Sequence, residues 1–139
     1  MYLKGRGVVK DEDKGYDFLA KAAEGGEAAA MFDLGQVLRS GLFGRKAQPE
    51  AARNWLARAA ATGHGGAILA LAAMLKDGSG GKADPEGALR WYIIAQKSGM
   101  SGEALDAAIR ELLGKLPPGV ALQAEKAADA WMAAKANSK

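Results

Sequence analysis

The hydrophobic residues of segment 29–40 recur every four positions and would share one face of a helix: Ala30, Leu34 and Leu38. Gly41 follows this stripe, and glycine often ends a helix because it tolerates the left-handed conformation. A second segment begins at Pro49, a residue suited to the first turn of a helix, where its missing N–H breaks no hydrogen bond. The pattern therefore predicts two amphipathic helices joined by a turn, the second ending near Gly63.

The chain repeats this helix pair at an interval of 36 or 37 residues. In the second helix the interval is 36, as it is between Trp55 and Trp91. In the first helix it is 37, as it is between Leu34 and Leu71, because the turn inside the first pair is one residue longer. Regular self-similarity of this length indicates a helical-repeat protein, in which each pair buries its apolar face against its neighbours.

A partial copy precedes the two full ones. Phe18-Leu19 aligns with Trp91-Tyr92, whereas Tyr2 already corresponds to Leu38, so the first helix of this copy is missing. Two explanations stay open: the natural protein extends further in the N-terminal direction, or a true start codon leaves a half-repeat. We expect one repeat domain over residues 1–139, divided into a partial repeat (2–28), two repeats (29–65 and 66–102), a terminal half-repeat (103–116) and a capping helix (120–136).

The capping helix follows the helix-breaking sequence Leu116-Pro117-Pro118-Gly119. Arrays of helical repeats need a terminal element that covers their last apolar face. We expect one side of this helix to face the array: Leu122, Ala127, Ala130, Trp131 and Ala134.

These motifs resemble the Sel-one-like repeat family, relatives of the tetratricopeptide repeats, over residues 2–116. The residues that carry the resemblance are Leu34-Gly35, Trp55-Leu56, Ala59-Ala60, Gly63, Gly78-x-Gly80, Asp84, Trp91-Tyr92 and Gly99. Leu38 and Leu75 replace the usual tyrosine, and Ala72 replaces the usual glycine. The resemblance implies an all-α fold, a right-handed α–α superhelix built as a solenoid of antiparallel helix pairs. It also implies an adaptor or scaffold that binds a protein or extended peptide, in bacterial regulation or in the assembly of membrane-associated or secreted complexes.

Composition narrows the alternatives. The chain contains no cysteine, which excludes disulfides, thiolate zinc sites and a cysteine nucleophile. Its net charge is only +3, and its basic residues are spread among acidic ones, a pattern that does not favour nucleic acid. The longest apolar run, from Ala67 to Leu75, falls well short of the about 20 residues that a membrane span needs. The N-terminus lacks the apolar stretch of a signal peptide, but this leaves the compartment, periplasm or cytoplasm, open.

Candidate catalytic or ligand-binding residues have simpler interpretations. His64, the single histidine, is expected to be a solvated residue of the turn between repeats. The glycine-rich segment 78–82 lacks the spacing of a phosphate-binding loop, and the acidic segment 11–13 suits the start of a helix rather than a calcium loop. The tryptophans are expected in the core between neighbouring helix pairs. We therefore expect no catalytic residue, no cofactor and no metal.

The remaining candidate for a functional feature is a surface that binds a partner. In stacked helix pairs the first helices line the concave face, and the leucines at positions 34, 38, 71 and 75 are expected to be buried. The concave face would then carry partner-binding residues from three first helices: Phe32, Gln36, Arg39, Leu69, Ala73, Lys76, Asp106 and Arg110. Ala70 is expected to point outward as well. The alternative is a structural spacer within a longer solenoid, with no ligand of its own.

The sequence predicts that circular dichroism shows a strongly helical protein. Alanine dominates the apolar residues and is the best helix former, whereas strand-forming residues are few. A strand content above about 10% would contradict the all-α prediction.

Overall fold

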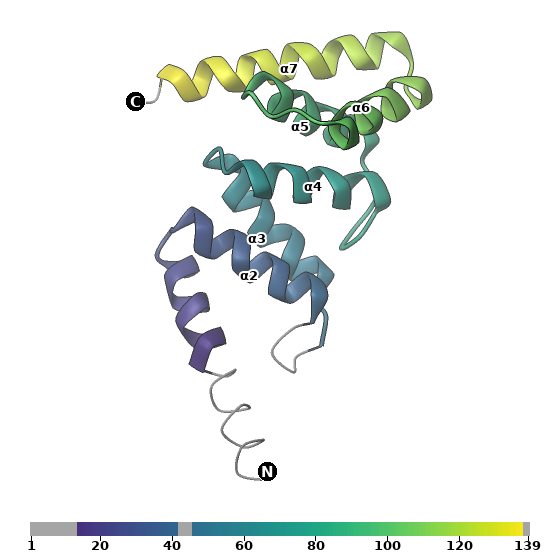
Figure 1. Cartoon of the computed structure of the whole chain (residues 1–139). Coiled ribbons are helices and arrows are strands. Elements are labelled where there is room, and N and C mark those ends of the chain that lie inside the picture. Colours follow the sequence, from purple (N-terminus) through teal and green to yellow (C-terminus); the bar gives the residue numbers. More distant parts are fainter. Residues whose placement is uncertain (1–13, 42–45, 138–139) are drawn as a thin grey trace. The chain divides into compact units, whose positions relative to one another are not determined.

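The computed structural model describes residues 14–41 and 46–137 (Figure 1). All regular elements in these ranges are α-helices. Residues 14–24 are helical. The six helices that follow are α2 (Ala28–Ser40), α3 (Pro49–Ala61), α4 (Gly65–Asp77), α5 (Pro85–Lys97), α6 (Glu103–Lys115) and α7 (Pro118–Asn137). The chain divides into two compact units, Met1–Ala67 and Ile68–Lys139, and α4 carries it from the first unit into the second.

In the first unit, α2 and α3 pack against each other as a helical hairpin. Leu34 of α2 and Leu56 of α3 are among its fully buried side chains. A Cβ atom at Gly35 would lie 2.7 Å from Cγ of Leu56, so a side chain at this position would collide with α3. Glycine beside Leu34 therefore sets how closely the two helices approach each other.

His64 holds the start of α4. The backbone N–H of Ala67 donates a hydrogen bond of 3.1 Å to Nδ1 of His64, which is the arrangement of an N-cap residue. The imidazole also packs on the ring of Phe32, with 4.8 Å between ring centroids. His64 is half-buried, so the expectation of a solvated turn residue was wrong: its side chain satisfies a helix terminus and covers an aromatic ring.

The second unit is built around α5, against which both α6 and α7 pack (Figure 1). Leu89 and Ile94 of α5 are fully buried. Asp84 caps α5, since its Oδ1 accepts a hydrogen bond of 3.0 Å from the backbone N–H of Gly87. The second helix of each full repeat thus begins with proline at its first position, as predicted.

The two tryptophans at the repeat interval are only half-buried, which corrects the expectation of core positions. In both Trp55-Leu56 and Trp91-Tyr92, the second residue is the buried one. Trp91 meets Trp131 of α7 edge to face, with 5.5 Å between ring centroids. The guanidinium of Arg58 lies 4.5 Å from the ring centroid of Trp55. Each tryptophan therefore covers the edge of a core that the next residue fills.

The helix faces differ from the predicted ones at several alanine-rich positions. On α7 the buried residues are Ala124 and Ala128, whereas the predicted contact residues Leu122, Ala130 and Ala134 are exposed. Elsewhere, Ala70 is buried instead of outward, and Leu75 is half-buried instead of buried. Alanine occurs on every side of these helices, so hydrophobicity alone does not distinguish neighbouring registers.

We predict that His64→Ala lowers the free energy of unfolding by about 1 kcal/mol, the usual effect of removing an N-cap. His64→Asn supplies another good capping side chain and should retain most of this stability. Urea denaturation of the two variants tests the prediction. Equal loss in both variants would instead assign the effect to the contact with Phe32.

We predict that Trp91→Ala destabilises the protein by about 2 kcal/mol, because the ring is half-buried and makes one aromatic contact. Ile94→Ala, at a fully buried position of the same helix, should cost about 3–4 kcal/mol. A double-mutant cycle with Trp131→Ala should give a coupling energy of about 1 kcal/mol. A coupling energy near zero would contradict a stabilising role for the edge-to-face pair.

Candidate functional site

An ion pair joins the first helices α4 and α6 in the second unit. Nζ of Lys76 lies 3.1 Å from Oε1 of Glu111, and Nζ of Lys115 lies 3.1 Å from the other carboxylate oxygen. Hydrogen bonds from these two lysines lower the pKa of Glu111, and the bond to Glu111 raises the pKa of Lys76. The ion pair thus links the two helices and balances the charge of Lys76.

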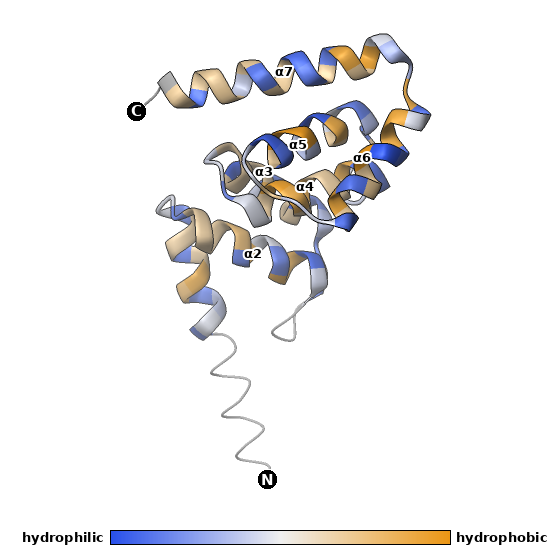
Figure 2. Ribbon diagram, turned by 45° about the horizontal axis from the view of Figure 1, so that its top comes forward, coloured by the Kyte–Doolittle hydropathy of each residue, from blue (hydrophilic) through white to orange (hydrophobic). Residues whose placement is uncertain are grey.

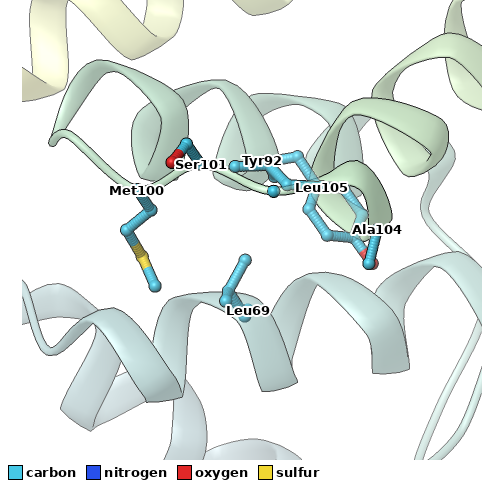
Figure 3. A pocket seen from close by; sticks show the side chains of 7 residues that line it. Leu69, Tyr92, Met100, Ser101, Ala104 and Leu105 are labelled. Carbon is cyan, nitrogen blue, oxygen red and sulfur yellow. The ribbon is translucent and has the colours of Figure 1, made fainter.

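An apolar pocket of about 280 Å³ opens on the same side of α4, between α4, α5 and the start of α6 (Figure 3). Leu69 points into the pocket from α4, and the side chain of Met100 approaches it from the turn between α5 and α6. The lining residues are Leu69, Tyr92, Met100, Ser101, Gly102, Ala104 and Leu105. The pocket has the apolar lining and few polar groups that are typical of a site for one hydrophobic group.

The predicted partner-binding residues of the second unit lie around this pocket in the following way. Leu69 lines it, and Ala73 and Lys76 follow at successive turns of α4, both half-buried. On α6, Asp106 and Arg110 are exposed. The structure therefore places Leu69 at the pocket and pairs Lys76 with Glu111, whereas Asp106 and Arg110 are exposed residues of α6 that do not line the pocket.

The predicted residues of the first unit lie on α2. Phe32 is half-buried against His64, so part of its ring already serves the fold. Gln36 is half-buried and Arg39 is exposed. Of these three residues, only Arg39 is exposed.

Sequence reasoning missed the residues that complete the pocket, above all Met100 and Leu105. Met100 lies between two helices, where a hydrophobic residue has no periodic partner that would mark it. An apolar residue inside a glycine-rich turn is a signal that could have indicated it, since flexible methionine side chains suit binding surfaces.

The other features considered from the sequence are a metal site, a phosphate-binding loop and a membrane helix. No group of three histidine, aspartate or glutamate side chains within residues 14–41 and 46–137 is placed to hold a metal ion. Gly78 and Gly80 have φ angles of 80° and 77°, so the glycines of segment 78–82 serve a tight turn. Among the helices described, none has the length and hydrophobicity to cross a membrane. The acidic segment 11–13 lies outside the described residues.

The chain was compared with known proteins. The family model of the Sel1 repeat matches residues 1–27, 28–64 and 66–99. No curated protein matches the chain. Among solved structures, it is similar to the crystal structure of a protective antigen present in uropathogenic Escherichia coli strains that displays an SLR fold, with 28% sequence identity and a TM-score of 0.77. The similarity covers 86% of this chain and 25% of the antigen, so the chain spans about a quarter of that protein's length.

The helices, the repeat interval and the structural similarity agree with one another. The three matched repeats cover more than half of the chain, and they include both helix pairs identified from the sequence. α6 and α7 lie beyond the last matched repeat. The chain therefore belongs to the Sel1 repeat family, whose all-α helical repeats generally serve as scaffolds for protein–protein interaction.

Proposed function

We propose that this chain is a non-catalytic adaptor that binds an extended segment of another protein along the outward face of α4 and α6. The observation that carries the proposal is the apolar pocket beside Leu69, on the face of α4 that continues to the ion pair between Lys76 and Glu111. An apolar hollow rimmed by polar residues is a common feature of protein-binding surfaces.

The partner's main anchor in this proposal is one hydrophobic side chain. A cavity of about 280 Å³ is small, and its entrance is bordered by the half-buried Leu69 and Met100. Binding energy at protein interfaces is concentrated in a few well-packed anchors, surrounded by contacts that mainly exclude water. The remaining outward residues would contribute such surrounding contacts.

Charged residues contribute less to partner binding in this proposal than the sequence alone suggests. Arg39, Lys76 and Arg110 would favour an acidic partner, but Glu111 balances Lys76. Asp106 lies one helical turn from Arg110 and further weakens a positive field. The apolar anchor, rather than the sign of the partner's charge, therefore dominates recognition in this proposal.

The similarity to part of an Escherichia coli antigen supports a bacterial setting for the proposed adaptor. In the antigen the SLR-like region that matches is about a quarter of the protein. Repeats of this kind present extended surfaces on which neighbouring units each supply one or two side chains. An adaptor function requires no reacting group, which agrees with the proposed use of a surface.

We predict that a photo-crosslinking amino acid at position 73 captures the partner in the source cell, because the half-buried Ala73 lies one helical turn from Leu69. The captured protein, identified by mass spectrometry, is then measured for binding to the purified chain. Leu69→Ala should weaken this binding at least about tenfold, the effect expected for loss of an anchoring side chain.

Lys126→Ala is the control, since it shortens an exposed side chain of α7 that lines neither this pocket nor the hollow between α5, α6 and α7. This variant should bind the partner with unchanged affinity. A crosslinking residue at the exposed Ala130 of α7 provides the second control. Capture only from position 130 would move the interface to α7, and capture from neither position would favour the structural spacer.

A further inference from the structure

A second hollow, of about 510 Å³, lies where α5, α6 and α7 meet in the second unit. Its lining combines five apolar and three polar residues: Ile93, Gln96, Lys97, Ile109, Leu113, Ala121, Leu122 and Glu125. Figure 2 shows hydrophobic residues on both sides of the turn that connects α6 with α7. The hollow is formed mainly by helices beyond the last matched repeat, so it is distinct from the pocket beside Leu69.

The hollow exposes leucine side chains that the fold does not use. In the part of the chain that the structure describes, three large hydrophobic side chains are strongly exposed: Phe18 at 76%, Leu122 at 53% and Leu113 at 46%. Leu113 and Leu122 both line this hollow, one from α6 and one from α7. Exposed apolar residues that gather in one concave place mark an interaction surface rather than scattered surface hydrophobicity.

The third of these side chains lies on the other unit. Phe18 belongs to the helical residues 14–24 of the first unit, in which Ala23 is buried and Phe18 is exposed to solvent. Its ring is the most exposed large hydrophobic group of the described residues. The chain thus carries an apolar projection on one unit and an apolar hollow on the other.

The charges beside these two features are complementary. Lys14 and Lys21 lie four residues before and three residues after Phe18, so both exposed lysines share its helix face, with Asp17 and Glu24 farther round the helix. At the hollow, Lys97 is held by Asp129, with 2.9 Å between Nζ and Oδ1, and Glu125 lies near it. Two carboxylates therefore surround one ammonium group, which leaves negative charge to meet the lysines.

We propose that the hollow between α5, α6 and α7 receives the helical residues 14–24 of a second copy of this chain, with the ring of Phe18 as its anchor. The two contacting surfaces differ from each other, so the contact is heterologous. After pairing, one copy keeps its free hollow and the other keeps its free helix, and further copies can add in the same direction.

Sedimentation velocity of the wild-type chain over increasing concentration tests the proposal, and the average mass is expected to rise with concentration. Phe18→Asp and Leu122→Asp should each abolish this increase, because either change places a carboxylate in the apolar contact. Both side chains are exposed, so both variants should keep the helical circular dichroism spectrum of the wild type. Ala107→Asp, at an exposed position of α6 outside the hollow, is the control and should associate like the wild type.

An equimolar mixture of Phe18→Asp and Leu122→Asp is the decisive measurement. The first variant keeps an intact hollow and the second keeps an intact helix, so the mixture should form a one-to-one dimer and nothing larger. A mixture that stays monomeric while the wild type associates would show a symmetric contact and overturn the proposal. A wild-type chain that stays monomeric at every concentration would overturn it as well.

Discussion

The short distance between paired helices is the constraint on which the rest of this structure depends. Gly35 lets α2 lie so close to α3 that a Cβ atom at this position would collide with the side chain of Leu56. On α3, the buried residues Ala52 and Ala59 also have small side chains. Helices that lie this close leave little room for large side chains between them. Bulky residues are therefore displaced to the edges of the pairs, where Trp55 and Trp91 are half-buried. The contact between Trp55 and Arg58 at the edge of the first pair agrees with this arrangement.

The second unit shows how the repeat pattern gives way to a different arrangement at its C-terminal end. α5 contacts both α6 and α7, so it serves as the shared wall of two surfaces. Tyr92 faces the pocket beside Leu69, whereas Ile93, the next residue, lines the hollow with Leu113 and Leu122. Adjacent residues of one helix thus line two distinct hollows.

The sequence was sufficient to predict the fold class, the family and the main turns, because these depend on glycine, proline and repeat spacing. It was not sufficient to predict which side of an alanine-rich helix is buried. On α7 the choice between Ala124 and Ala130 depends on where Trp131 meets Trp91, a contact between residues 40 positions apart in the chain. The sequence analysis named Leu69 as an outward residue but predicted no pocket, and Met100, which lies in a turn, was not named. The partner-binding role of the outward residues stays a prediction.

The capping bond of His64 ties the helix that follows it to the helical hairpin that precedes it. Nδ1 of His64 accepts the hydrogen bond from the backbone N–H of Ala67, while the same ring packs on Phe32 of α2. One side chain thus links the start of α4 to α2. The helix that leads from the first unit into the second therefore begins at a residue that is anchored in the first unit. A change of the side chain at position 64 would alter the first turn of α4 and the surface of α2 at once.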